Sequence, residues 1–281
     1  MQLTIVHDTV YRYGQAASLI IQALRMWPAP SAGQTIGHWQ VNVDGRRLQP
    51  TCRDGFGNLV ATHTIDRSVE TLRLSVRGAV STRDMHGLHD DPKEPLPPMF
   101  YLSSTPLTQS NAAIDALATS SAGSGGDVER LHRLTHGVRD RIDYLPYPTD
   151  AETSAAEAFA AQAGVGQDHA HVLIAAARSL GFPARYVSGY LCPREGGAAA
   201  SHAWAEIFVA DRGWQGFDAA NRQSTDERYV RIACGRDYRD AAPVRGVRLG
   251  GIAESLEVQV TLAESAQSQS QSQSQSHWTS R

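Results

Sequence analysis

The sequence predicts an α+β protein, in which an N-terminal antiparallel β-sandwich-like domain is followed by helices packed on a second antiparallel sheet. Residues 1–95 alternate apolar and polar side chains in short runs separated by turn residues, which is typical of strands with one buried face. Between residues 108 and 180 the apolar residues recur at helical spacing, and from residue 184 the alternation returns. Strands followed by helices and further strands indicate an α+β architecture.

Composition narrows the classes of protein to which the chain can belong. Its 281 residues are enough for two domains with buried cores. Hydrophobic residues make up 41% and charged residues 20%, which argues against a disordered chain and against a membrane protein. The net charge of -3 argues against nucleic-acid binding through a basic surface. Because no apolar run is long enough to span a bilayer and the start does not resemble a signal peptide, we expect a soluble, cytoplasmic protein.

The first strands are expected at Leu3–His7, His38–Val43 and Leu72–Val76. Turn clusters at Asp44–Gly45 and Asp54–Asn58 separate these runs. Four prolines between residues 92 and 98 exclude a sheet interior there. A boundary near residue 95 follows, with a β domain over residues 1–95.

Helical signals begin after this linker. Asn111–Ala118 carries apolar residues at helical spacing, and Asp127 is a candidate N-cap for a second helix that extends to Val138. Thr153–Glu157 resembles a capping box, with Glu157 three residues after Ser154. The clearest helix is expected over Gly164–Leu180, because Gly181 and Pro183 end it.

Strands are expected again at Ala184–Leu191, Ser201–Ala210, Gly213–Asp218 and Ser255–Leu262. In the second of these, period-two alternation places His202 on one face with Trp204, Glu206 and Phe208. The Gln-Ser repeat over Gln267–Ser276 has no apolar residue to bury and indicates a disordered tail over residues 265–281.

Several stretches, in one order along the chain, resemble the transglutaminase-like superfamily of papain-type folds, and more closely its bacterial two-domain group with a β-rich N-terminal region. The resemblance begins at His7–Tyr13. Its most specific stretches are Thr153–Ala158, Gly164–His171, Pro183–Tyr190, Ser201–Glu206, Trp214–Asp218 and Gly235–Tyr238. It implies a papain-like transglutaminase core over residues 96–264.

The resemblance also implies a site. The family transfers acyl groups from an amide to an amine or to water with a Cys-His-Asp triad. Carried over by position, the histidine is His202 and the orienting acid is Asp218, whereas the cysteine position holds Gly166. A helix N-terminus and a partner histidine favour a thiolate at that position, but glycine has no side chain and is neither a nucleophile nor a base. The resemblance therefore predicts that the His202 ring faces Gly166 across a site that lacks its nucleophile.

Cysteines and further histidines are the other candidates for a nucleophile or a metal site. The cysteines Cys52, Cys192 and Cys234 are scattered and form no CxxC pair, so they indicate neither a disulfide framework nor a zinc site. None of them is favoured as a substitute nucleophile. His169 and His171, two residues apart on a helix, point in divergent directions. No metal and no cofactor is therefore expected, and His202 and Asp218 also remain open to interpretation as ordinary core and turn residues.

Three functions remain open from the sequence. The favoured one is a non-catalytic protein that binds a peptide or protein partner in the relic cleft. The second is an active cysteine-protease-like or transglutaminase-like amide hydrolase or acyltransferase, with an unrecognised nucleophile or a water activated by His202. The third is a structural assembly protein. An intact pair of His202 and Asp218 favours the first two, because a scaffold has no evident need of it.

Overall fold

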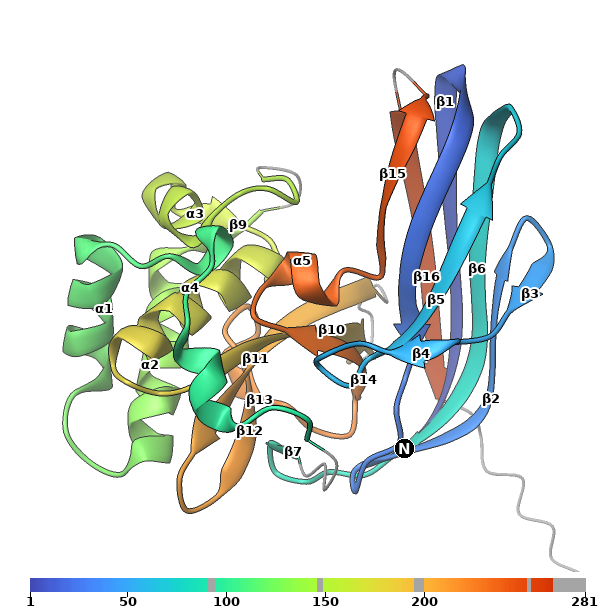
Figure 1. Cartoon of the computed structure of the whole chain (residues 1–281). Helices are drawn as coiled ribbons and strands as arrows, with labels where there is room; N and C mark the ends of the chain where they lie inside the picture. Colours follow the sequence, from blue (N-terminus) through green and yellow to red (C-terminus); the bar gives the residue numbers. More distant parts are fainter. Residues whose placement is uncertain (90–93, 146–148, 195–199, 252–253, 265–281) are drawn as a thin grey trace, which may run out of the picture.

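The computed structural model describes residues 1–89, 94–145, 149–194, 200–251 and 254–264. A tall antiparallel sheet lies beside a unit in which helices cover one face of a second antiparallel sheet (Figure 1). The predicted α+β class is confirmed. The Gln-Ser repeat and the centre of the proline-rich linker lie outside the described residues. Within the described part of the chain, no helix is both long and apolar enough to cross a bilayer.

The first sheet is organised around one strand of 26 residues, β1. Its core order is β3-β2-β6-β1-β5-β4, and β15 and β16 also pair with β1. The first half of β1 pairs with β6 and the second half with β5, with a register shift between Arg12 and Ala17. The strands are β1 (Gln2–Trp27), β2 (Gln34–Val43), β3 (Arg46–Leu48), β4 (Cys52–Arg53), β5 (Leu59–Ile65), β6 (Val69–Thr82), β15 (Val244–Gly250) and β16 (Glu254–Glu264).

The sheet curls around its own core because alternate side chains of its strands are apolar. On β1 the inward residues after the register shift include Ile20 and Leu24, and they share a core cluster with Leu72, Leu74 and Val76. Burial of apolar surface on one face of each strand is the main stabilising contribution to such a sheet. The predicted alternation over residues 1–95 therefore reflects this curled inner face.

The last two strands belong to the first sheet, although they follow the helical core in the sequence. Strands β15 and β16 pair antiparallel with β1, for example through Val6 and Thr261. Figure 1 shows both strands beside β1, although they end the described chain. Alternation identifies a strand but not its partner, because pairing depends on which sheet edge the chain reaches.

The helices begin and end where local chemistry favours it. Asn111 caps α1 by accepting from two backbone N–H groups, and Ser154 and Glu157 form the predicted capping box of α3. Asp127 is the first residue of α2 and not its N-cap, which is Gly126. The helices are η1 (Pro98–Leu102), η2 (Pro106–Thr108), α1 (Ala112–Ala122), α2 (Asp127–Arg141), α3 (Ala155–Ala161), α4 (Gly166–Ser179) and α5 (Tyr238–Ala241).

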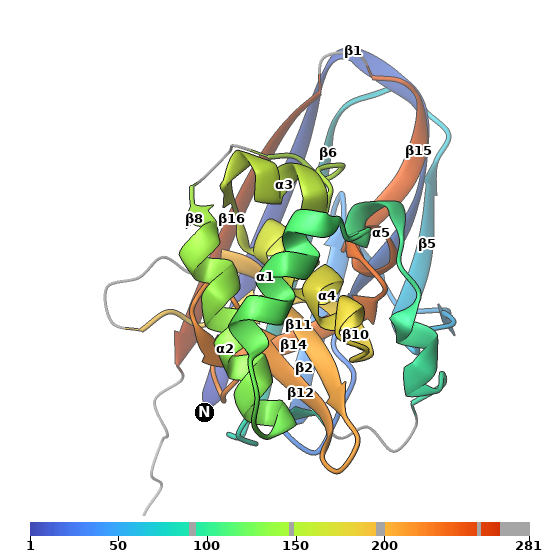
Figure 2. The ribbon, with the colours of Figure 1, turned by 90° about the vertical axis from the view of Figure 1, so that its left-hand side faces the viewer.

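Helix α4 is the central element of the second unit. It packs against β10 and β11 on one side and against α1, α2 and α3 on the other, and Figure 2 shows these three helices in front of it. The sheet has the order β13-β12-β11-β10-β14, with β7 on β12. Its strands are β7 (Leu88–His89), β10 (Ala184–Leu191), β11 (Ala200–Val209), β12 (Gly213–Asp218), β13 (Gln223–Ser224) and β14 (Tyr229–Gly235); β8 (Asp143–Tyr144) and β9 (Ala163–Gly164) form a separate parallel pair.

Two amide side chains of the first unit cover the outer edge of β14. Gln34 donates to the Arg231 carbonyl and accepts from its N–H, both at 2.9 Å. Asn58 makes the same pair of bonds to Cys234, at 2.7 and 2.8 Å. Each amide thus replaces a neighbouring strand, which satisfies backbone groups that an edge strand leaves unpaired. These contacts fix the first unit against the sheet that carries His202.

A buried histidine on β1 joins the two units. His7 Nδ1 lies 2.8 Å from the Tyr190 hydroxyl and Nε2 lies 2.8 Å from Thr9 Oγ1. Burial, the largest cause, lowers the pKa of His7 to about 4. The folded protein therefore holds the neutral imidazole at pH values where an unfolded chain is protonated.

This histidine makes stability depend on pH. Because the unfolded chain takes up the proton first, the contribution is complete above the unfolded pKa of 6.5 and is lost as the pH falls toward 4. For His7 alone we expect a loss of about 2 kcal/mol between pH 7 and pH 5. His7→Gln keeps hydrogen-bonding groups without a titration, so its free energy of unfolding, measured with urea, should fall by correspondingly less. An equal fall in both proteins would contradict this assignment.

Candidate active site

The N-terminus of α4 forms one side of the candidate site. Gly166 is its first residue and Val165 is its N-cap. The Asp168 carboxylate accepts from the Val165 N–H and from the Thr149 hydroxyl, both at 2.7 Å. This carboxylate therefore caps the first turn of the helix. The unpaired N–H groups of that turn give the position of Gly166 a positive electrostatic potential.

His202 and Asp218 form the other side. His202 Nε2 lies 2.6 Å from Asp218 Oδ2, and the same oxygen accepts from the Tyr229 hydroxyl and the Asn221 amide, both at 2.7 Å. Burial alone would raise the pKa of Asp218, but the charge of His202 and these hydrogen bonds lower it. Asp218 is therefore an ionised carboxylate that fixes the orientation of the imidazole.

The structure brings Gly166 and His202 together. A β-carbon on Gly166 would lie 3.0 Å from both Nδ1 and Cε1 of His202. Since Nε2 bonds Asp218, Nδ1 is the ring nitrogen that faces the helix. Trp204 stacks against the ring at a centroid distance of 6.4 Å. A base, an orienting acid and a helix N-terminus thus converge on one point, and Gly166 places no side chain there.

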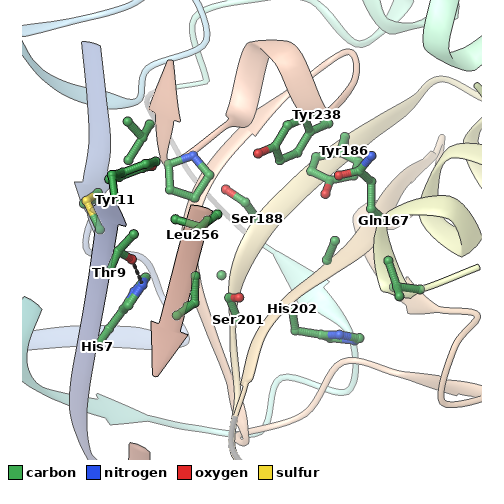
Figure 3. Close-up of a pocket in the computed structure, with 18 of the residues that line it drawn as sticks. His7, Thr9, Tyr11, Gln167, Tyr186, Ser188, Ser201, His202, Tyr238 and Leu256 are labelled. Atoms are coloured by element: carbon green, nitrogen blue, oxygen red, sulfur yellow. Dashed lines mark hydrogen bonds between the residues drawn. The ribbon is translucent and has the colours of Figure 1, made fainter. Parts of the chain in front are cut away.

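A cleft of about 300 Å³ opens beside this point, between the two units. Gly166, Gln167, His202 and Ser201 line it from the second unit, whereas its opposite wall comes from β1, β15 and β16. Figure 3 shows His202 and Gln167 on one side and Tyr11 and Leu256 on the other. The β-rich first unit is therefore part of the site.

His169, His171 and the three cysteines do not line this cleft, and among the described residues they form no metal site. His169 contacts two carbonyl oxygens, of Val165 at 2.9 Å and Ile142 at 3.1 Å. His171 is buried and accepts from the Tyr238 N–H. Among the described residues, no three His, Cys, Asp or Glu side chains are grouped as metal ligands. None of the three cysteines is among the residues that line the cleft.

The cysteines differ in exposure, which gives a labelling prediction. Cys52 is exposed, whereas Cys192 and Cys234 are buried and burial raises the pKa of both thiols. With iodoacetamide near neutral pH we expect alkylation of Cys52 alone, at the rate of an ordinary thiol. Peptide mass mapping measures the modified positions. Fast labelling of Cys192 that is lost in His202→Ala would instead reveal a relocated nucleophile.

Two further groups support the site, and neither is among the residues predicted from the sequence. Tyr229 and Asn221 both donate to Asp218. Asn221 follows Asp218 by three residues, a spacing at which an Asp side chain also accepts from the backbone of a turn, so a local signal exists. Tyr229 lies on another strand, and no local pattern identifies it.

Glu206 is a buried carboxylate on the strand that carries His202. It lies between Arg185, at 2.6 Å, and Arg231, at 2.9 Å. The Arg185 guanidinium in turn lies 4.0 Å from the centre of the Trp214 ring. Glu206 and His202 lie on the same face of β11. This charge network therefore supports the strand that carries the candidate base.

Comparisons with known proteins agree with this architecture. Residues 115–219 match the model of the transglutaminase-like superfamily, and residues 3–81 match that of the bacterial transglutaminase-like N-terminal region. An uncharacterized protein of Mycobacterium leprae is 27% identical over 94% of this chain and 99% of its own length. An uncharacterized protein of Mycobacterium tuberculosis is 29% identical over 86% of each chain.

A solved structure shares the fold. A cysteine protease candidate from Cytophaga hutchinsonii superimposes with a TM-score of 0.75 at 24% identity, and the match covers 94% of this chain and 90% of that one. The alignment spans both units, so their combination is a feature that the two proteins share. The chain is therefore similar to the transglutaminase-like superfamily over residues 115–219 and to the bacterial transglutaminase-like N-terminal region over residues 3–81.

Proposed function

We propose that the protein is a non-catalytic member of this group, which binds a peptide or an extended segment of a partner protein in the cleft. One observation carries the proposal: the first residue of α4, which faces His202 Nδ1, is Gly166. Acyl transfer through a covalent intermediate needs a sulfur or oxygen nucleophile within reach of the base. In this proposal Gly166 occupies the nucleophile position, and His202 and Asp218 remain as a relic pair.

The shape of the cleft supports a peptide ligand. Near His202 the cleft is lined by polar side chains such as those of Gln167 and Ser201. The opposite wall includes Leu256 and Val258, which are 56% and 46% exposed. Exposed apolar side chains beside hydrogen-bonding groups suit a chain that carries both a backbone and apolar side chains. Ser201 also lines the cleft and is exposed.

Obstruction of the cleft tests this proposal. Peptides selected from a random display library on the native protein, then labelled with a fluorophore, should bind Ser201→Trp at least tenfold more weakly. The matched control is Ser255→Trp, because alternation places Ser255 on the face of β16 opposite Leu256. Fluorescence anisotropy measures both affinities. An absence of selected binders, or equal affinity for the two variants, would reject peptide binding in the cleft.

A second function is favoured by the retained geometry of Asp218. A carboxylate that accepts from His202, Tyr229 and Asn221 is the arrangement that a general base requires. His202 would then take a proton from water, whose oxygen attacks the amide carbon and releases ammonia from a glutamine side chain. Ammonia release from a glutamine peptide that disappears in His202→Ala would establish this hydrolase. Under the favoured proposal both proteins release none.

A further inference from the structure

A second cavity, of about 260 Å³, lies inside the curled first sheet. Tyr11, Val244 and Leu256 line both this cavity and the cleft, so the two spaces adjoin. Figure 3 shows Tyr11 and Leu256 on the side of the cleft away from His202. A ligand in the cleft therefore lies beside an additional space. We call it the Gln22 cavity, after its most unusual lining residue.

Gln22 lies on the inner face of β1 and is 6% exposed. Its amide oxygen Oε1 is buried, and no hydrogen-bond donor among the described residues reaches it. A buried carbonyl without a donor is unfavourable, and folded proteins rarely tolerate one. An apolar side chain of the same size would avoid this cost, so the amide indicates a binding role.

Strand β15 holds this amide in place. Gln22 pairs with Gly246, and a β-carbon there would lie 2.9 Å from Gln22 Cα and 3.0 Å from its Cγ. It would also lie 2.1 Å from the Ile21 carbonyl oxygen. Only glycine therefore permits this close approach.

Among the described residues that line the rest of the cavity, each charged side chain has a partner of opposite charge. Tyr13, Ile20 and Val247 contribute aromatic and apolar surface. Arg248 and Glu254 are also part of its lining, but their side chains pair with each other at 2.6 Å. A neutral ligand with an apolar body and one hydrogen-bond donor is complementary to this surface. Aromatic side chains with a polar tip have this character.

We propose that the Gln22 cavity binds a tyrosine side chain of the peptide in the cleft, whose hydroxyl donates to Gln22 Oε1. The inference rests on the proposed function, because it names a specificity subsite of the same cleft. The phenol ring packs against Tyr13 and the apolar residues, and the hydroxyl reaches the amide. Phenylalanine fills the same space but leaves Oε1 without a donor, so the cavity discriminates between the two.

The side-chain analogues p-cresol and toluene test this subsite on the full chain without any peptide. The native protein should bind p-cresol about fivefold more tightly than toluene, which is the effect of one net hydrogen bond. In Gln22→Leu the preference should invert, because the hydroxyl is then buried without a partner. Ligand-observed NMR titrations give the affinities. Gln22→Met serves as the second variant if Gln22→Leu does not fold.

His202→Ala is the matched control, since it alters the cleft and leaves the Gln22 cavity intact, and it should retain the preference for p-cresol. A preference that persists in the Gln22 variants would overturn the proposal, as would a native protein that binds neither compound or prefers toluene. The two proposals fail separately. If p-cresol binding depends on Gln22 but no peptide binds the cleft, the cavity recognises a phenol independently of any peptide, and the proposed function is rejected.

Discussion

Gly166→Cys should create a reactive thiol in a protein that has none in its cleft. The new side chain would start at the N-terminus of α4, with its β-carbon 3.0 Å from His202 Nδ1. Both the helix dipole and a protonated imidazole stabilise a thiolate, so the pKa of the thiol should fall well below ~8.5. Because 3.0 Å is tight, the imidazole has to move by a few tenths of an ångström, and the backbone of Gly166 does not require a positive φ.

The expected change in rate follows from two opposing effects. At pH 6 a cysteine with a pKa of ~5 is almost entirely thiolate, whereas one with a pKa of ~8.5 is less than ~1% thiolate. A thiolate of lower pKa is a weaker nucleophile, which offsets most of that advantage. Alkylation by iodoacetamide at pH 6 should therefore be roughly tenfold faster than for an ordinary exposed thiol. Mass spectrometry of a Cys52→Ser background measures this rate.

The matched control for this experiment is Gln167→Cys in the same background. Residue 167 is also in the first turn of α4, so a thiol there experiences the same helix dipole. The position that faces His202 is residue 166. Fast alkylation should be specific to Gly166→Cys and should slow when His202→Ala is added. If the thiol at residue 166 reacts no faster than the control, the relic-site interpretation fails, and His202 and Asp218 are ordinary core residues.

Glu206→Gln should lower the free energy of unfolding strongly, although the substitution is conservative. The change removes the negative charge between Arg185, which is fully buried, and Arg231, which is 16% exposed, and leaves Arg185 with Glu94 as its remaining carboxylate partner. Loss of one partner from a buried ion pair costs about 3–5 kcal/mol. The free energy of unfolding, measured with urea at pH 7, should fall by that amount. The control, Glu129→Gln, breaks an exposed pair with Arg133 and should cost about 0.5 kcal/mol or less.

The same network predicts a dependence on pH. Burial alone would raise the pKa of Glu206, but the charges of Arg231 and Arg185 lower it below its usual value of 4.5. Because the pKa of Glu206 is lower in the folded protein, its stabilising contribution is complete above the unfolded pKa. The contribution is lost as the pH falls from the unfolded pKa toward the folded pKa. The difference between the native protein and Glu206→Gln should therefore shrink below pH 4.5. A constant difference would show that packing, not charge, is responsible.

Local sequence determined most of the secondary structure. The strands at Ala184–Leu191 and Gly213–Asp218 have the predicted bounds, because turn residues flank them, although nearly every residue in them is buried rather than every second one. The capping box of α3 was likewise visible in Ser154 and Glu157. The sequence also singled out Gly166, His202 and Asp218 as one group, through motifs in one order along the chain. The strands and the capping box depend on residues close together in the sequence, whereas the group of three residues was inferred from the resemblance.

Only the tertiary structure decided which distant segments meet. The pairing of β16 with β1, the amides of Gln34 and Asn58 on the edge of β14, and the Tyr229 hydroxyl on Asp218 all join residues without a shared local pattern. Such contacts are selected by the packing of whole sheets, since a sheet edge or a buried charge accepts any partner that satisfies its hydrogen bonds. The cleft and the Gln22 cavity exist for the same reason. The cleft lies where β1, β15 and β16 face the second unit, and the Gln22 cavity lies among these three strands. No single segment of the sequence encodes either meeting.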